Sequence, residues 1–494
     1  MREKGTGGTS VDPETLRALA ATRARDVALA EEPEQMLRAL ARYLEVQPGN
    51  DVAWADKAGL LIALRRFDEG MEACRQALAI NPRQMSARFH LGTACTKLGR
   101  LDEAEDLFRE ILSVEPDRME ARLALAECLL GRRRLEAARE VLAEVIQQDP
   151  ASLKAHQLMG QSLYEQGRWS EFRLELDRFE RHAPLSDYLE FERGFENLLR
   201  GIMPLGWRQW EARLRVPGCV GPERDFKEPR WDGGLFGGKT LLVHYEQGLG
   251  DTMMLARFLP QVKARGGTVV LLAQPELAGL MTTCRGVDLI VPQGGLLPPF
   301  DLQVSLYSLP AVLQVDLASL PGEVPYLGVP RQVPNRDRID ERLTASEGRL
   351  RIALAWTGNP THRRDAERSI PVGLLERLAV LPGVAWHGFQ VGSREEPALP
   401  DYVPMAPLLD SFADTAYALE RMDLVISVDT ALAHLAGALG VPVFLLVTHA
   451  PDFRWMLDRE DSPWYPTMRI FRQPRQYDWG PVLDGIVQAF AEEE

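Results

Sequence analysis

The chain has 494 residues, which is long enough for two or three separate hydrophobic cores. Its hydrophobic content of 45% and charged content of 26% are typical of a globular protein, which argues against a disordered or membrane-embedded chain. The net charge of −14 argues against sequence-independent nucleic-acid binding, because contact with phosphates needs a basic surface.

The N-terminus and the cysteines indicate the cellular compartment. The first residues, MREKGTGGTSVDPE, contain no apolar stretch of the kind found in a signal peptide. The sequence also has no apolar run of about 18 residues that would span a bilayer. Five cysteines, an odd number without a CxxC pair, fit a reducing compartment and offer no zinc site. We therefore expect a cytoplasmic protein without a transmembrane segment.

The N-terminal part is a repeat array. Prolines recur with a period of 34 residues, which is that of the tetratricopeptide repeat (TPR). They are Pro48, Pro82, Pro116, Pro150 and Pro184. The small residues Ala58, Gly92, Ala126 and Gly160 keep the same register. We predict a solenoid domain over residues 1–186, with four full repeats at 51–84, 85–118, 119–152 and 153–186 and a degenerate one from about Glu14 to Asn50.

The repeats suggest a role in binding. A lone helix pair cannot bury its apolar face, so small residues let neighbouring pairs stack, and the concave face that results commonly binds a partner. The alternative is a spacer or a dimer surface, and we favour partner binding. Cys74, Cys95 and Cys128 occupy small-residue positions of the repeats, where we expect them to serve in packing.

A helical linker is predicted over residues 187–235. Its composition is helical, with breaks expected at Pro204 and Gly206. Trp207 and Trp210 are three apart and would share one face of the helix. We interpret these tryptophans as docking residues rather than as a ligand platform.

Residues 236–345 alternate strands and helices, the pattern of a parallel sheet with binding loops at its carboxyl edge. The strand TLLVHY leads through EQGLGD into an amphipathic helix, and Gly248 and Gly250 would let the backbone approach a ligand. Asp251 is either the N-cap of that helix or a carboxylate placed at a cleft to deprotonate a hydroxyl. The segment is not GxGxxG and lacks the lysine of a P-loop, so neither a dinucleotide nor an ATP site is predicted.

Residues 346–494 begin a second alternating set with the strand Leu350 to Trp356. Its polar turn, Thr357, Gly358 and Asn359, is followed by a basic cluster placed to bind a diphosphate. The cluster comprises Arg363, Arg364 and Arg368, before a helix that Pro371 would start. Gln390 lies near the end of the next strand, VAWHGFQVG.

The segment from Asp423 to Val447 reads as a complete strand-helix-strand unit. We predict strands at Leu424 to Val428 and Val443 to Val447, and a helix over Thr430 to Leu439 that Gly440 closes. Asp429 stands where an N-cap belongs. The free N–H groups near Thr430 and Ala431 would face the crevice where an anionic ligand binds. The aromatic-rich stretch that follows either closes over this crevice or fixes the C-terminus.

Three motifs carry a family resemblance: GLGD in the first half, WTGNP with its trailing arginines, and ISVDTALAHLAGALGVPV in the second half. With them, the region from about Trp231 to Phe490 resembles the heptosyltransferase-like glycosyltransferases of family nine, which have the GT-B architecture of two Rossmann-like domains. With the repeat array in front, the chain resembles bacterial TPR-linked glycosyltransferases, including those that modify flagellins. The expected fold class is therefore α plus α/β, an α-solenoid followed by a GT-B region.

The resemblance implies an inverting transfer, without a metal or other cofactor, from a nucleotide-activated sugar bound by residues 346–494. Asp251 matches the proposed base of the family. Thr357, Gly358, Asn359 and Arg368, the helix start at Thr430 and Ala431, and Gln390 would hold the donor, while Asp429 and His434 would contact its hydroxyls or phosphate. His434 could instead only pack. The sequence RRDAER replaces the usual phosphate-loop lysine, which speaks against heptose as the donor sugar.

Three functions stay open from the sequence. The first is a protein-modifying glycosyltransferase whose repeats recruit the acceptor, for example flagellin. The second is a transferase that builds a lipid or polysaccharide glycan. The third is a scaffold whose transferase half has lost activity, against which the joint presence of Asp251, Arg368 and Asp429 speaks.

Overall fold

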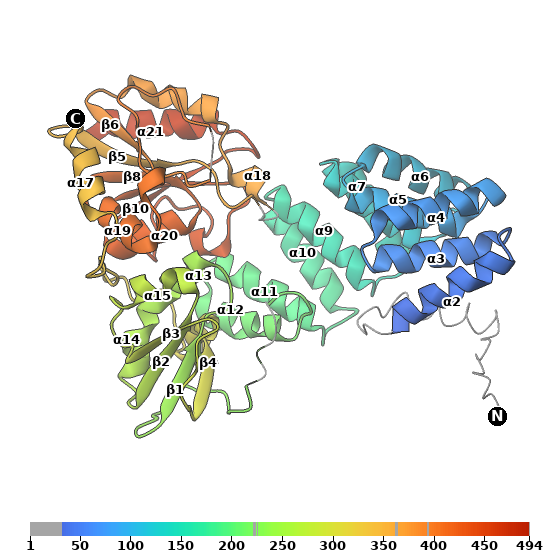
Figure 1. Cartoon of the computed structure of the whole chain (residues 1–494), viewed down its shortest axis with the longest axis horizontal. Coiled ribbons are helices and arrows are strands. Elements are labelled where there is room, and N and C mark those ends of the chain that lie inside the picture. Colours follow the sequence, from blue (N-terminus) through green and yellow to red (C-terminus); the bar gives the residue numbers. More distant parts are fainter. Residues whose placement is uncertain (1–31, 221–223, 225, 361–363, 393–394, 494) are drawn as a thin grey trace, which may run out of the picture. The chain divides into compact units, whose positions relative to one another are not determined.

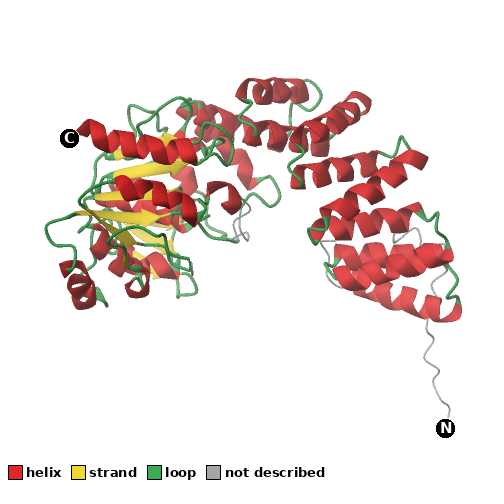
Figure 2. Cartoon of the chain, turned by 90° about the horizontal axis from the view of Figure 1, so that it is seen from above, coloured by secondary structure: helices red, strands yellow, loops and turns green. Residues whose placement is uncertain are grey.

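The computed structural model describes residues 32–220, 224, 226–360, 364–392 and 395–493. The chain divides into two compact units. Met1–Tyr164 and Trp169–His182 form the first, and Glu165–Arg168 and Ala183–Glu494 form the second. The main part of the second unit thus starts at Ala183, just before the predicted end of the repeat domain at residue 186. Figures 1 and 2 show helices through the first unit and strands only in the second.

The first unit consists of helix pairs in the predicted register. After α2 (Glu32–Val46), the pairs are α3 (Asp51–Ala63) with α4 (Phe67–Ile80), α5 (Met85–Lys97) with α6 (Leu101–Val114), α7 (Met119–Gly131) with α8 (Leu135–Gln148), and α9 (Leu153–Glu165) with α10 (Trp169–Glu180). One pair falls in each predicted full repeat, which confirms the solenoid. Of the degenerate repeat predicted from about Glu14 to Asn50, residues 32–50 are described and contain α2, and the part before residue 32 lies outside the described residues.

Small residues let these helices approach closely. A methyl group on Gly92 would lie 2.8 Å from the Phe108 ring, so the ring packs directly on the glycine backbone. Cys74, Cys95 and Cys128 are fully buried, as a packing role requires. The array is thus held by interhelical burial.

The linker helices open the second unit. They are α11 (Asp187–Leu199), α12 (Met203–Trp210) and the 3-10 turn η1 (Glu211–Leu214). The break predicted at Pro204 and Gly206 is wrong, because the chain turns at Gly201, whose φ is 78°, and Pro204 lies in the first turn of α12. Proline is well tolerated there, since the first helical N–H groups have no partner inside the helix.

The first sheet has four parallel strands in the order β3-β2-β1-β4. Their bounds are β1 Thr240–His244, β2 Thr268–Ala273, β3 Leu289–Pro292 and β4 Leu302–Ser305. Between β1 and β2 the predicted amphipathic helix is divided into α13 (Leu249–Leu255), η2 (Ala256–Phe258) and α14 (Leu259–Lys263), and α15 (Pro275–Met281) precedes β3.

The second sheet has six parallel strands in the order β10-β9-β8-β5-β6-β7. Their bounds are β5 Leu350–Ala355, β6 Val384–Gly388, β7 Val403–Pro404, β8 Leu424–Val428, β9 Val443–Val447 and β10 Met468–Arg472. Helices α17 (Arg336–Thr344), α19 (Phe412–Leu419), α20 (Ala431–Leu439) and α21 (Gly480–Glu493) complete it. Pro371 directly precedes a 3-10 helix, η4 (Val372–Val380), instead of the α-helix predicted.

The strands of the second sheet are buried on both faces, as parallel sheets between helices are. Trp386, Ile426 and Leu354 form part of one core and are essentially inaccessible to solvent. The α-solenoid followed by an α/β region with two parallel sheets confirms the predicted fold class. No helix in the described part of the chain has both the length and the apolarity needed to cross a membrane.

Candidate active site

The predicted strand-helix-strand unit is present as β8, α20 and β9, and Gly440 ends the helix with a φ of 77°. The prediction that Asp429 is the N-cap is wrong. Thr430 holds that position with an extended backbone (φ −141°, ψ 172°) and makes no side-chain bond to the helix. Its hydroxyl lies 3.3 Å from Ser427 Oγ instead. The first turn at Ala431 is therefore not capped by a side chain, which leaves N–H groups for an anion.

Asp429 links the helix start to the basic loop. Its carbonyl oxygen accepts a hydrogen bond of 3.1 Å from Arg368 Nη1, so the predicted phosphate-binding arginine lies beside the start of α20. Its carboxylate is 3.8 Å from His434 Nε2. Burial, and then the nearby Asp452 carboxylate, raise the pKa of Asp429.

The loop after β5 is shaped by Gln390. Its Oε1 accepts hydrogen bonds from the backbone N–H groups of Trp356 (3.0 Å) and Thr357 (2.9 Å). The amide oxygen of Gln390 therefore orients the loop, and the polar turn ends in the exposed Asn359.

Gly358 lies against the Arg368 guanidinium. A methyl group on Gly358 would be 2.3 Å from Arg368 Nη2, closer than any real contact allows. Arg368 Nε also pairs with Asp365 Oδ1 at 3.0 Å. Arg364 pairs with Glu367 and donates to the Ala450 carbonyl, whereas Arg363 lies outside the described residues. Of the described arginines in the basic cluster, Arg368 is the one in contact with the turn before α20.

Asp251 lies in the first turn of α13, and Gly248, not Asp251, is the N-cap. Asp251 Oδ2 accepts the Gly248 N–H at 2.8 Å, and its Oδ1 accepts the Tyr307 hydroxyl at 2.9 Å. Arg454, which belongs to the second half, forms an ion pair with the same Oδ1. The candidate base is thus held by groups from both halves.

Arg454 is a site residue that the sequence analysis did not single out. It lies in the 3-10 turn η6 (Phe453–Trp455) and is only 8% exposed. Its Nη1 is 2.5 Å from Asp452 Oδ1, and the neighbouring carboxylates of Asp251 and Asp452 raise its pKa well above the usual value despite burial. The signal in the sequence was an arginine inside the aromatic stretch PDFRW, in the segment expected to close the crevice or fix the C-terminus.

His434 packs where α13 meets α20. A methyl group on Gly250 would lie 2.6 Å from His434 Cδ2, so the glycine allows the two helices to approach. His434 Nδ1 is hydrogen-bonded to the Tyr465 hydroxyl at 2.9 Å, and the ring stacks on Trp455. Burial lowers the pKa of His434 to about 3, so the ring is neutral at physiological pH. The His434 ring thus packs within the same cluster as Asp429, and its contact with the donor stays a prediction.

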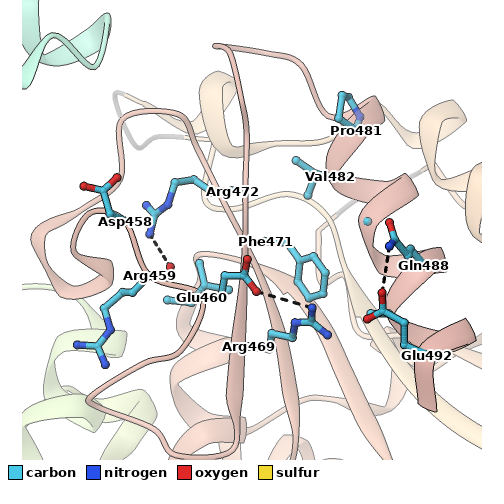
Figure 3. Close-up of a pocket in the computed structure, with 13 residues that line it drawn as sticks. Asp458, Arg459, Glu460, Arg469, Phe471, Arg472, Pro481, Val482, Gln488 and Glu492 are labelled. Carbon is cyan, nitrogen blue, oxygen red and sulfur yellow. Dashed lines mark hydrogen bonds and ion pairs between the residues drawn. The ribbon is translucent and has the colours of Figure 1, made fainter.

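A separate cavity of about 580 Å³ lies between β10, the loop 458–460 and α21 (Figure 3). Its charged lining includes Arg469, which is 3.7 Å from Glu460. None of the predicted site residues lines it.

Among the described residues, no group of three or more His, Cys, Asp or Glu side chains is arranged to hold a metal ion.

Comparison with known families finds similarities in both parts of the chain. Tetratricopeptide repeat families match residues 55–113, 96–161 and 129–190. Glycosyltransferase family 9 (heptosyltransferase) matches residues 400–477, the stretch that contains α20, Asp429 and Arg454. Residues 55–190 are thus similar to tetratricopeptide repeats, and residues 400–477 are similar to glycosyltransferase family 9.

Individual proteins are similar to parts of this chain. Protein FlbA of Caulobacter vibrioides is 27% identical over 332 residues, covering 61% of this chain and 54% of FlbA. The chain thus spans about half the length of this curated relative. Among solved structures, MamA from Desulfovibrio magneticus RS-1 (18% identical, TM-score 0.30) covers 36% of this chain and 96% of its own. A tetratricopeptide repeat protein from Parabacteroides merdae (16%, TM-score 0.35) covers 42% and 82%.

Proposed function

We propose that the protein is a glycosyltransferase that moves a sugar from a nucleoside-diphosphate donor to an acceptor hydroxyl. The observation that carries this proposal is the family 9 match over residues 400–477, in a segment that sets Arg368 beside the uncapped start of α20. A cation and free backbone N–H groups at one place are the chemistry that binds a diphosphate.

The reaction follows from this arrangement. Asp251 takes the proton of the acceptor hydroxyl, the acceptor oxygen bonds to the anomeric carbon, and the bond from that carbon to the diphosphate breaks. The electron pair leaves with the diphosphate, whose growing charge Arg368 and the N–H groups at Thr430 and Ala431 stabilise. Attack from the face opposite the leaving group inverts the anomeric centre.

No metal or other cofactor enters this proposal. Arg368 supplies a fixed positive charge, and the helix start adds the partial positive charge of its dipole. These groups take the place of a divalent cation at the leaving diphosphate. Inversion and metal independence both follow the resemblance to the family 9 enzymes.

The acceptor is a protein recruited by the repeat array, for example flagellin, because stacked helix pairs present an extended surface suited to a polypeptide. Two alternatives compete. The transferase could instead build a lipid or polysaccharide glycan, or it could be an inactive scaffold. The ion pair of the partly buried Asp251 with the buried Arg454 disfavours an inactive scaffold, because charged pairs of this kind are commonly found at functional sites.

A donor screen tests the proposal. Thermal shifts are measured with UDP-, GDP- and dTDP-sugars, and with a CMP-sugar as the single-phosphate control. One of the diphosphate donors is expected to raise the melting temperature by an amount that grows with the logarithm of its concentration. The response should be lost in Arg368→Gln and kept in Arg377→Gln, an exposed arginine paired with Asp484. Absence of a response to every donor would favour the scaffold.

A further inference from the structure

The contacts among the described residues leave the Asp251 carboxylate one position for a further hydrogen bond. Oδ1 accepts from both Tyr307 and Arg454, and Oδ2 accepts from the Gly248 N–H. Each carboxylate oxygen has two lone pairs, so these contacts fill Oδ1 and leave one lone pair on Oδ2. Oδ2 is therefore the oxygen with room for a further hydrogen-bond donor.

Tyr307 and Arg454 form a chain that ends on Oδ1. The guanidinium donates to the Tyr307 oxygen, and the Tyr307 O–H donates to Asp251. Burial raises the pKa of Tyr307 well above its ordinary value, so the phenol keeps its proton and stays a donor. Arg213 lies 5.5 Å from the Tyr307 ring and donates to Ser308 Oγ at 3.0 Å, which fixes the neighbouring turn.

The segment that carries Arg454 is held by the linker helices. The ring of Phe453 contacts Trp207 at 5.6 Å and Trp210 at 5.1 Å between centroids. Directly after η6, Met456 has a φ of 50°, an unfavourable conformation for a non-glycine residue that the surrounding packing must maintain. The position of the guanidinium is thus set by contacts on both sides of it.

We propose that Arg454 is the positioning residue of Asp251: with Tyr307 it occupies Oδ1, so that the remaining lone pair of Oδ2 takes the proton of the acceptor hydroxyl. The proposal rests on the proposed function and adds a residue and an atom to it. The proton moves from the acceptor oxygen to Oδ2 while that oxygen bonds to the anomeric carbon and the sugar-phosphate bond breaks. Arg454 itself binds neither donor nor acceptor.

The experiment compares Arg454→Ala with the wild-type full chain, using the diphosphate sugar that gives the largest thermal shift in the donor screen. Release of nucleoside diphosphate gives kcat and KM. We expect kcat to fall by about 100-fold or more, the typical contribution of a positioned base. KM for the donor should change by less than about threefold, because donor binding is untouched.

Chemical rescue separates positioning from a structural role. Guanidinium chloride at about 50 mM, far below denaturing concentrations, should raise kcat of Arg454→Ala by about tenfold and leave the wild type and Asp251→Asn unchanged. The matched control is Arg469→Ala, which removes an arginine in the cavity of Figure 3 and should behave like the wild type.

Several results would overturn the proposal. A rise in KM with kcat unchanged would make Arg454 a donor-binding residue, and a fall in kcat that guanidinium does not restore would make it structural. If Arg454→Ala does not fold, Tyr307→Phe decides, because it keeps the buried ring and removes one bond to Oδ1. We expect kcat of Tyr307→Phe to fall by about tenfold at unchanged KM. A Tyr307→Phe protein with the kcat of the wild type would refute the role of the hydrogen bonds that lead from Arg454 through Tyr307 to Asp251.

The two proposals fail in distinguishable ways. A wild-type protein that neither binds nor consumes any nucleotide sugar refutes the proposed function, and the role of Arg454 with it. A wild-type protein that consumes the donor, next to an equally active Arg454→Ala, refutes only the positioning role.

Discussion

At the scale of single residues, the absence of a side chain at Gly358 makes room for the positively charged Arg368 guanidinium. The Arg368 guanidinium and Asp365 Oδ1 both occupy the space that a Cβ on Gly358 would take, at 2.3 and 2.4 Å. In Gly358→Ala we expect the flexible arginine to move away from the start of α20. Donor affinity measured by calorimetry should then fall by about tenfold, or about 1.4 kcal/mol.

The control for this change is Gly373→Ala, because no atom lies within 4 Å of a methyl group at that glycine. Its donor affinity should equal that of the wild type. Unchanged affinity in Gly358→Ala would mean that Arg368 does not contact the donor from its present position.

Buried His387 gives the stability a defined pH dependence. Its two ring nitrogens lie 2.9 Å from the Ala385 carbonyl oxygen and 3.2 Å from Ser346 Oγ, and burial lowers its pKa to about 4. The unfolded chain therefore binds more protons between pH 6.5 and 4. The contribution of neutral His387 to stability is fully present above pH 6.5 and is lost as the pH falls toward 4. This loss lowers the free energy of unfolding by up to about 3 kcal/mol.

His387→Phe removes the titrating group, so scanning calorimetry should show a shallower fall in melting temperature over this pH range. The exposed His182 provides the control, since His182→Phe should leave the slope as in the wild type. Equal slopes for all three proteins would exclude His387 as a source of acid sensitivity.

At the scale of elements, local chemistry made much of the second half predictable. Runs such as LVISV and VFLLV indicate buried parallel strands, and Gly440 marks the end of α20. The N-cap was misassigned because Asp429 and Thr430 are both good capping residues, and only the backbone angles at Thr430 distinguish them.

Long-range contacts were not predictable from patterns. Arg454 and Asp251 are 203 residues apart in the chain, and no periodicity relates them. Gln390 was placed near the donor because of its position after a strand, whereas its amide oxygen turns back onto the Trp356 and Thr357 N–H groups. Such contacts depend on tertiary packing, which a single sequence does not encode as a local signal.

Helix α12 is expected to stabilise the second unit through Trp207. This side chain is 1% exposed and packs edge-to-face on Phe453 and Trp464, with centroids 5.6 and 6.2 Å away. Trp207→Ala should cost about 3–5 kcal/mol, the typical loss for a buried aromatic residue. Denaturant unfolding followed by circular dichroism measures this cost.

The control is Leu205→Ala in the same helix. Leu205 is 40% exposed, so its replacement should lower the free energy of unfolding only slightly. If Trp207→Ala unfolds at the same denaturant concentration as the wild type, α12 does not support the segment that carries Arg454.

At the scale of the whole molecule, the halves of the second unit are joined by a buried charge. Arg257, 3% exposed, donates to the Pro321 carbonyl at 3.0 Å and to the Trp464 carbonyl, while its guanidinium faces the Tyr465 ring. Together with the ion pair of Asp251 and Arg454, these contacts mean that residues from both halves form the candidate site.

The repeat array is expected to serve the acceptor and not the donor. Removing residues 1–164, which keeps Glu165–Arg168 of the second unit, should preserve donor binding and the slow hydrolysis of the donor, and should abolish transfer to a co-expressed candidate acceptor such as flagellin. Intact-mass analysis detects the sugar increment on the acceptor. Undiminished modification by the shortened protein would show that the repeats do not recruit it.

The central claim is that both halves act on one activated sugar, with Asp251 as the base. Its most direct test is nucleoside-diphosphate release by the wild type and Asp251→Asn, with Asp484→Asn as an exposed control. We predict that all three proteins bind the donor equally, that the wild type and the control release nucleoside diphosphate, and that Asp251→Asn is slower by about 100-fold or more. Equal turnover by Asp251→Asn, or no turnover by the wild type with any donor, would contradict the claim.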